Sequence, residues 1–212
     1  YNYSQNINME VKIDVNDTIK YYYLDDDNLL LVQKNRILEY KLTNRMITTI
    51  INSDYNILDL VYYSTNILYT YKDSKNTYHL ELINLDNLEI NPLYRYNTPI
   101  KIIGDEDLLL INSIANNTIA IYRIIDSYLE LEQEIKYTGK FRTFAISKFN
   151  NLIAISNMDN EVYIYTNLHN TNINYRYIQK IKCKDTNDFG YYLSISKYNN
   201  YMAISSIDDF NI

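Results

Sequence analysis

The feature that most constrains this chain is a stretch of β-patterned sequence that occurs nearly twice. Ala145–Ser156 closely matches Ser194–Ser205, with an Asn-Asn pair at the same place in each copy. In both copies apolar and polar residues alternate on either side of that pair, which is the pattern of two short strands joined by a turn. A near-duplicate inside one chain indicates an internal structural repeat.

The repeat belongs to a longer period. Each unit contains four runs rich in Ile, Val, Tyr and Thr, and in the second unit these are Ile57–Tyr63, Ile67–Lys72, Thr77–Leu85 and Leu88–Tyr96. The third runs of the four complete units recur at intervals of 41, 41 and 43 residues, at Ile37, Tyr78, Ile119 and Val162. Four strands in about 40 to 45 residues are typical of a propeller blade. The sequence therefore predicts an all-β fold, a β-propeller of four-stranded antiparallel blades with five repeat units.

The period also predicts the domain organisation, a single β-propeller domain over residues 1–212. Complete blades are expected at residues 18–52, 55–97, 98–139 and 140–183, and half blades at residues 1–16 and 184–212. Strands expected in the later units include Leu108–Ser113, Thr118–Ile125, Leu152–Asn157, Phe189–Ser196 and Tyr201–Ile207. Since two half blades make one blade, we expect either a closed five-bladed ring or an arc of a larger propeller. The ring is slightly favoured because it leaves no exposed strand edges. The segment Ser127–Lys136 fits a strand and a short helix equally well.

Two stretches resemble known propeller families. Phe144–Tyr165, with Asp159-Asn160 ahead of Val162, resembles the middle strands of a WD-repeat blade, and Tyr165 stands where that family has Trp-Asp. Asp188–Ser196 is similar to the FG-GAP repeat of integrin-like propellers. The chain has no Trp, no Gly-His at the blade starts and no calcium-binding loop of the FG-GAP type. The resemblance implies a propeller fold and carries over no particular activity.

Charge and cysteine content restrict the partners and the compartment. The net charge is −6 and there is no basic block, which argues against a general surface for nucleic acid or anionic membrane. Any charged partner is expected to be a basic protein. The single cysteine, Cys183, indicates a reducing, intracellular (cytoplasmic) location, or a virion if the A/T-rich codon bias reflects a virus. No run is long enough for a membrane span.

Two acidic turns and two aromatic residues are the candidate binding residues. Asp25-Asp26-Asp27 and Asp105-Glu106-Asp107 lie between the first and second strands of units one and three, so we expect them on one face of a propeller. They are read either as a docking patch for a basic partner, with a weak calcium site as a variant, or as solvated turns, which are more common. Phe149 and Tyr198 occupy equivalent turn positions and are candidate exposed anchors.

The sequence shows no catalytic motif. His79 and His169 lack spaced Cys or His partners, so neither a metal site nor a cofactor is expected. Cys183 has no recognisable His partner for nucleophilic catalysis. We therefore expect a non-enzymatic protein-protein interaction or assembly scaffold. The alternative is a glycan-binding or glycoside-processing propeller, and cleavage there would need two carboxylates about 5 to 10 Å apart.

Overall fold

The computed structural model describes residues 19, 21–24, 28–63, 66–105, 108–113, 117–125, 128–147, 151–167, 173–183, 188–196 and 199–207. Every regular element in these ranges is a β-strand. The described residues contain no helix that is long and apolar enough to cross a membrane. The chain separates into two compact units, Tyr1–Asn52 and Ser53–Ile212, which are described in turn.

The first unit holds one four-stranded antiparallel sheet in chain order. Its strands are β1 (Tyr21–Leu24), β2 (Asn28–Val32), β3 (Arg36–Lys41) and β4 (Met46–Asn52). Ile37 is fully buried and lies opposite Val32 and Ile51 on the two neighbouring strands. The hairpin between β2 and β3 closes through a 2.9 Å bond from Gln33 N to Arg36 O.

The second unit holds three four-stranded antiparallel sheets and one two-stranded sheet. The first consists of β5 (Ile57–Tyr63), β6 (Asn66–Lys72), β7 (Tyr78–Asn84) and β8 (Ile90–Tyr96). The second consists of β9 (Ile100–Asp105), β10 (Leu108–Ser113), β11 (Thr118–Ile125) and β12 (Tyr128–Lys136). The third consists of β13 (Phe141–Ile146), β14 (Leu152–Asn157), β15 (Glu161–Asn167) and β16 (Tyr175–Lys182). The two-stranded sheet pairs β17 (Leu193–Ile195) with β18 (Met202–Ile204).

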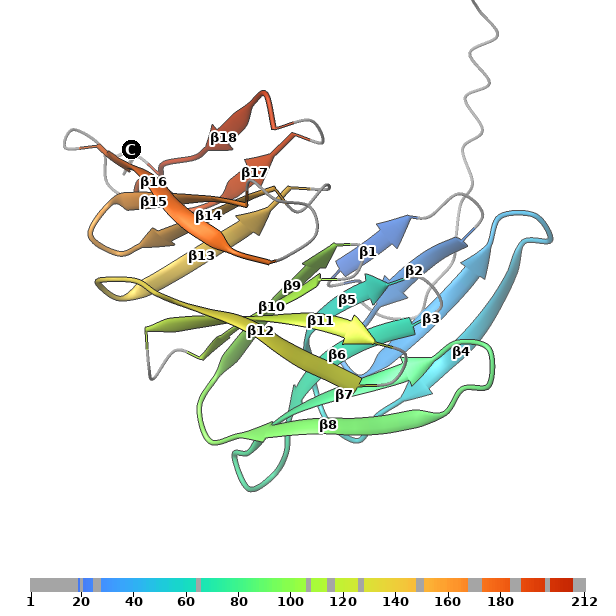
Figure 1. The fold of residues 1–212 in the computed structure, drawn as a ribbon. Coiled ribbons are helices and arrows are strands. Elements are labelled where there is room, and N and C mark those ends of the chain that lie inside the picture. Colours follow the sequence, from blue (N-terminus) through green and yellow to red (C-terminus); the bar gives the residue numbers. More distant parts are fainter. Residues whose placement is uncertain are drawn as a thin grey trace, which may run out of the picture. The chain divides into compact units, whose positions relative to one another are not determined.

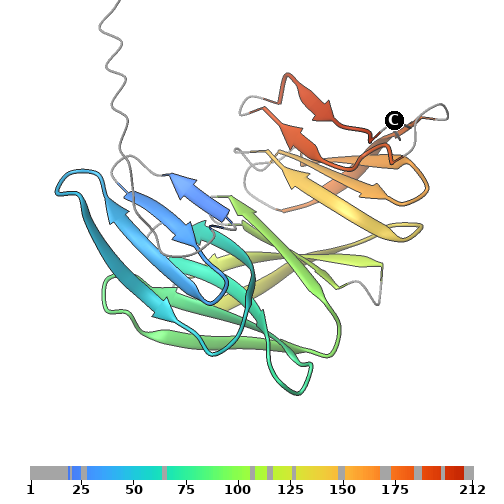
Figure 2. The same ribbon diagram turned by 180° about the vertical axis from the view of Figure 1, so that it is seen from behind.

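Within the second unit the sheets pack face to face. The first strands of successive sheets are neighbours, β5 beside β9, β9 beside β13 and β13 beside β17, whereas the fourth strands lie outermost (Figures 1 and 2). One apolar cluster, which includes Leu68, Leu80 and Leu109, fills the seam between the first and second sheets. Another, which includes Ile121 and Ile155, fills the seam between the second and third sheets. We call these the first seam and the second seam.

Polar side chains also cross the two seams. In the first seam Asp59 Oδ2 of β5 accepts a 3.0 Å hydrogen bond from the backbone N–H of Ile102 in β9. In the second seam the side-chain amide of Gln133 in β12 makes two bonds to the backbone of Tyr175, the first residue of β16. Gln133 Nε2 donates to Tyr175 O at 2.9 Å and Gln133 Oε1 accepts from Tyr175 N at 2.8 Å. Each sheet is therefore fastened to the next by specific bonds as well as by packing.

Asparagines close equivalent hairpins. Asn76, Asn117 and Asn160 each precede the third strand of a sheet and have positive φ values of 64°, 49° and 60°. Asparagine tolerates this left-handed conformation better than most residues because its short side chain bonds locally to the backbone. The Asn-rich composition thus has a structural use at these turns.

A β-bulge recurs between the third and fourth strands of all four four-stranded sheets. The register shifts after Ile37, Leu80, Ile121 and Ile164, which lie 43, 41 and 43 residues apart. In each case the fourth strand carries one extra residue, and in β16 that residue is Ile178. An extra residue bends and twists the strand locally.

The near-duplicate stretches form equivalent hairpins. Ser147 Oγ accepts the N–H of Leu152 at 3.1 Å, and Ser196 Oγ accepts the N–H of Tyr201 at 3.0 Å. The expected strands of the fifth unit, Phe189–Ser196 and Tyr201–Ile207, are shorter than predicted. The chain bends at Gly190, whose φ is +81° and whose N–H bonds to Ser205 O, so the regular ladder begins only at Leu193.

The all-β prediction and the four-stranded antiparallel sheets are confirmed, and Tyr128–Lys136, the described part of the ambiguous segment, is strand β12. Three of the four residues that define the period are equivalent in the structure. Tyr78, Ile119 and Val162 each lie two residues after a turn asparagine and two residues before the bulge, although Tyr78 is half-buried and the other two are fully buried. Ile37 instead stands directly at the bulge of its sheet.

Candidate functional site

Most residues predicted to bind a partner lie outside the described residues. This holds for Asp25, Asp26, Asp27, Glu106, Asp107, Phe149 and Tyr198, and also for His169. Asp105 ends β9 opposite Leu108, and only its backbone is described. The acidic docking patch and the aromatic anchors therefore remain predictions.

The hairpin between β6 and β7 instead carries a compact polar and aromatic site. Asp73 Oδ1 accepts the N–H groups of Lys75 and Thr77, both at 2.9 Å, which holds the turn closed. The other oxygen, Oδ2, lies 2.9 Å from His79 Nε2. The bond to His79 is the main reason that the pKa of Asp73 lies below its usual value, and the backbone bond from Thr77 adds to it.

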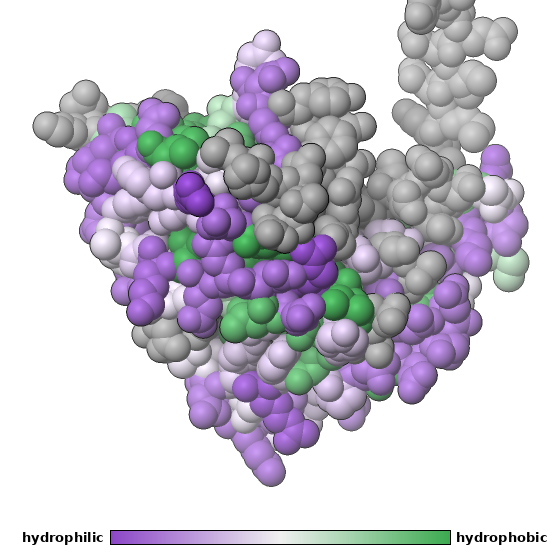
Figure 3. Space-filling model, in the orientation of Figure 1, coloured by the Kyte–Doolittle hydropathy of each residue, from purple (hydrophilic) through white to green (hydrophobic). Residues whose placement is uncertain are grey.

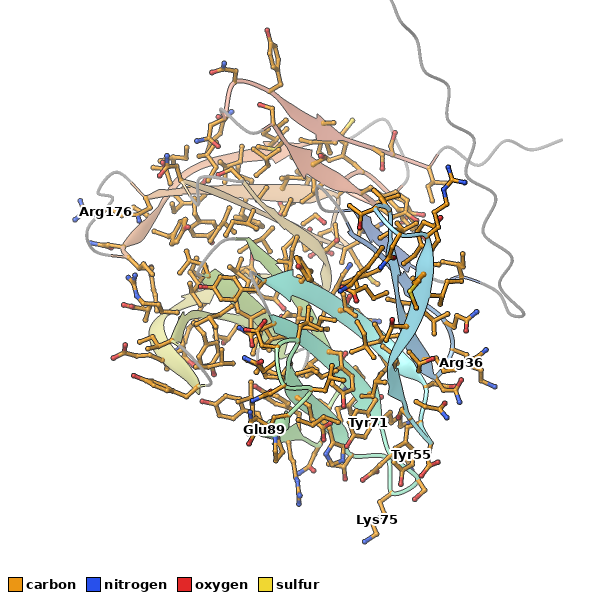
Figure 4. The ribbon with its side chains drawn as sticks, turned by 90° about the vertical axis from the view of Figure 1, so that its right-hand side faces the viewer. Arg36, Tyr55, Tyr71, Lys75, Glu89 and Arg176 are labelled. Atoms are coloured by element: carbon orange, nitrogen blue, oxygen red, sulfur yellow. The ribbon has the colours of Figure 1, made fainter. Side chains whose placement is uncertain are left out.

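Three rings stack beside this hairpin. The ring of Tyr71 lies between Tyr55 and His79, with centroid distances of 5.4 Å and 4.7 Å and nearly parallel planes. Tyr55 precedes β5 and Tyr71 lies on β6, and Figure 4 shows them near the hairpin tip that carries Lys75. The stack orients the imidazole toward Asp73, so His79 has a structural role at this hairpin.

Glu81 on β7 binds the hydroxyl groups of two tyrosines. Tyr71 OH donates to Glu81 Oε1 at 2.8 Å, and Tyr69 OH donates to Glu81 Oε2. Burial, followed by the bond to Glu81, raises the pKa of both tyrosine hydroxyls. Both phenols therefore stay protonated as donors, and both carboxylate oxygens of Glu81 already have a partner.

A shallow hollow of about 280 Å³ lies beside this cluster. Its lining comes from two strands, β7 with His79, Leu80 and Glu81, and β8 with Pro92, Leu93, Tyr94 and Arg95. The bulge creates it, because Leu80 pairs with Tyr94 and Glu81 with Pro92, so that Leu93 is extra. A hollow of this size is at the lower limit of small-molecule sites and suits one side chain of a partner.

The site is suited to binding rather than to bond cleavage. Asp73 is bonded to the turn and to His79, and Glu81 to two tyrosines, so neither carboxylate points at an open reaction site. Among the described residues no group of three His, Cys, Asp or Glu side chains is placed to hold a metal ion. The arrangement offers shape, hydrogen bonds and aromatic surface.

The outer strands form a second exposed surface. Large apolar or aromatic side chains on them are more than a third exposed, namely Ile90, Tyr94, Tyr128, Leu131, Tyr177 and Ile178. Figure 3 shows hydrophobic residues (green) separated by hydrophilic ones (purple) on the face where β12 lies in front. Neighbouring outer strands differ in charge: β12 contains three Glu and one Lys, whereas β16 contains one Arg, two Lys and no acidic residue.

Sequence reasoning missed the stacked rings because tyrosine is so common here, with 25 in the chain. A signal was present in the order Tyr69, Tyr71, Asp73, His79 and Glu81, whose even spacing places these side chains on one face of a hairpin. The bulge that opens the hollow leaves no comparable mark in the sequence.

Comparison with known proteins identifies the fold. No family model matches the chain, and no curated protein matches it by sequence. Solved structures do match, and they include WD40 β-propellers. Hsv2 of Kluyveromyces lactis has a TM-score of 0.65 at 13% identity, over 93% of this chain and 67% of its own.

Two further structures give the same result. The Cps50 (Swd1) beta-propeller domain of Myceliophteria thermophila has a TM-score of 0.66 at 12% identity, over 92% of this chain and 69% of its own. KlAtg21, in complex with the coiled-coil of AgAtg16, has a TM-score of 0.65 at 12% identity, over 90% of this chain and 63% of its own. The chain thus spans about two thirds of the length of these structures. At such identities the likeness shows the fold alone, that of a β-propeller.

Proposed function

We propose that this chain is a non-enzymatic WD-like propeller module that serves as a protein-interaction platform. The observation that carries the proposal is the hollow on β8, which lies on a strand with exposed Ile90 and Tyr94. Anchoring side chains at protein interfaces are typically aromatic or aliphatic groups held in such pockets. Two solved structures with this fold are protein assemblies, the KlAtg21 complex with a coiled-coil and the Mitotic Checkpoint Complex.

The proposal includes the five repeat units predicted from the sequence, with half blades at residues 1–16 and 184–212, arranged as a closed ring or as an arc. It also includes an intracellular setting, which the single cysteine supports. Small-angle scattering of the purified chain separates a compact ring from an open arc, because the two differ in radius of gyration. Nothing in the comparisons favours the glycan-binding alternative.

The platform is tested by site-specific photo-crosslinking in extracts of the source cells. A photoreactive amino acid in place of Arg95, at the hollow, is expected to capture a defined protein, and Tyr94→Ala in the same chain is expected to reduce that product. Tyr128→Ala is the matched control, since Tyr128 is also an exposed tyrosine but lies on β12. Capture that is unchanged by Tyr94→Ala, or turnover of a substrate by the purified chain, would overturn the proposal.

A further inference from the structure

The strand β16 combines three properties that do not occur together on another described outer strand of the second unit. It is the last strand of its sheet in the described residues, so one backbone edge faces away from β15. Five consecutive residues, 176–180, are exposed. All its charged side chains are basic, namely Arg176, Lys180 and Lys182. An exposed edge with apolar and basic side chains is suited to pairing with another strand.

The contact with Gln133 shows that the backbone of β16 forms strand-like hydrogen bonds on the side that faces away from β15. The amide of Gln133 donates to the C=O of Tyr175 and accepts from its N–H, which are the two bonds that a paired strand residue would make. The N–H and C=O of Tyr175 therefore point away from β15. They bond to the side chain of Gln133, which takes the place of a neighbouring strand. By the alternation of an antiparallel ladder, Tyr177 is expected to direct its own N–H and C=O to the same side.

The charge of the edge is positive although the chain as a whole has a net charge of −6. Lys180 and Lys182 share one carboxylate, that of Glu161, at 3.1 and 3.2 Å. Two ammonium groups on one carboxylate leave a net positive charge, and Arg176 projects outward at the far end of the strand (Figure 4). The side chains that would flank an added strand thus favour an acidic one.

Apolar contacts are available along the same strand. Tyr177 is 55% exposed and Ile178, the bulge residue, is 53% exposed. Tyr177 is also held in place, since its ring contacts Tyr163 and Tyr165 at centroid distances of 6.4 and 5.9 Å. A rigid aromatic ring is a good anchor because little conformational entropy is lost on binding.

We propose that β16 is a docking edge for an extended acidic segment of a partner protein, which adds as a fifth strand to the sheet of β13–β16. Main-chain bonds to the edge would supply affinity. Lys180 and Lys182 lie on one face of the sheet and Arg176 on the other, so acidic side chains on either face of the added strand would meet a basic group and supply selectivity. This inference names one partner class for the proposed interaction platform and rests on that proposal, but it concerns a surface separate from the hollow on β8.

The test uses a fluorescent peptide of eight residues, the length of β16, in which Glu alternates with Val and Tyr. Fluorescence anisotropy with the full chain is expected to show binding that weakens at least tenfold when Lys replaces Glu. N-methylation of alternate peptide nitrogens, which removes main-chain donors but keeps the charge, is expected to abolish binding. Lys180→Glu, on the face of the sheet that carries both lysines, is expected to weaken binding several-fold, whereas Lys136→Glu, the same charge change on β12, should leave it unchanged.

Each other outcome overturns the inference. No binding by the acidic peptide, equal binding by the Lys peptide, or binding that survives N-methylation would each exclude an acidic added strand. Self-association of the chain in place of peptide binding would identify the occupant as a second copy. The peptide results are independent of capture at the hollow. If the chain captures a protein at Arg95 but binds no acidic peptide, the proposed interaction platform stands and the docking edge on β16 is excluded.

Discussion

The two seams of the second unit bury similar aliphatic cores but are fastened by different chemistry. The first seam uses a carboxylate, Asp59, which accepts the backbone N–H groups of Ile102 and Leu60. Desolvation is the largest influence on this group and raises its pKa above the usual value. The second seam uses the neutral amide of Gln133, which satisfies the backbone of the buried residue Tyr175.

The third sheet of the second unit also has a carboxylate, but one of the opposite kind. Glu161 is the first residue of β15, and Tyr163 OH donates to it at 2.5 Å while two lysines of β16 approach it. The bond from Tyr163, then those from Lys180 and Lys182, lower its pKa to about 2. The pKa values of two carboxylates in repeated sheets of one fold thus move in opposite directions, because burial dominates at Asp59 and donors dominate at Glu161.

The largest effects are expected from the aliphatic cores, which test whether the seams are equally well packed. Leu109 in the first seam and Ile155 in the second are fully buried. Leu109→Ala and Ile155→Ala should each lower the free energy of unfolding by about 2 to 5 kcal/mol through lost burial and a new cavity. Urea unfolding measures both, with Leu131→Ala, at an exposed position, as a control. Losses that differ more than twofold would show that the cores are unequal.

The amide of Gln133 should contribute the next largest effect, and only in the second seam. Gln133→Ala leaves the N–H and C=O of Tyr175 without these partners. An unsatisfied buried backbone group is costly, so we expect a loss of about 2 kcal/mol in urea unfolding. Gln179→Ala, at an exposed glutamine on β16, should be nearly neutral. A neutral Gln133→Ala would mean that packing alone holds the outer strands together.

The carboxyl of Asp59 should make the first seam sensitive to pH. Because its pKa is raised in the folded chain, its favourable contribution to folding is present at low pH and declines as pH rises through that pKa. The free energy of unfolding of the wild type, relative to Asp59→Asn, should therefore fall as pH rises above the ordinary carboxyl pKa of 3.8, with a slope of at most about 1.4 kcal/mol per pH unit. Urea unfolding at a series of pH values above 3.8 measures the slope. A slope of the opposite sign would contradict the assignment.

The smallest effect is expected at Glu161, with the opposite dependence on pH. Its pKa falls from the ordinary 4.5 to about 2, so its contribution is present above pH 4.5 and is lost as pH falls toward 2. Glu161→Gln should lower the free energy of unfolding by less than about 1 kcal/mol at pH 7, because ion pairs at the surface are weak. The loss should shrink in high salt and disappear near pH 2. A loss that persists at pH 2 would assign the effect to the hydrogen bond with Tyr163 instead.

Much of the fold could be predicted from the sequence because each strand carries its own local signal. Leu108–Ser113, Thr118–Ile125 and Leu152–Asn157 were predicted with the bounds that the structure has. Strand ends next to irregular backbone were predicted less well, as at Gly190, because a bend depends on bonds to residues elsewhere in the sequence.

The candidate sites could not be predicted to the same extent. Asp73 and Glu81 look like ordinary exposed acids in the sequence, and their partners come from a stack that also needs Tyr55 of the preceding loop. The basic edge of β16 is visible as Arg176, Lys180 and Lys182, but the net charge of the chain conceals it. Average composition therefore misleads where one strand departs from it.

The recurrent bulge changes the alternation of side chains along every outer strand. Alternate side chains of a strand lie on opposite faces of the sheet, and the extra residue shifts this alternation by one position. The set of alternate residues that points toward a neighbouring sheet before the extra residue is therefore replaced by the other set after it. Deleting Ile178 alone would make the ladder between β15 and β16 regular and would leave Lys180 opposite Tyr163 and Lys182 opposite Glu161. A single codon at this place therefore sets the local bend and twist of the strand while its cross-strand partners stay the same.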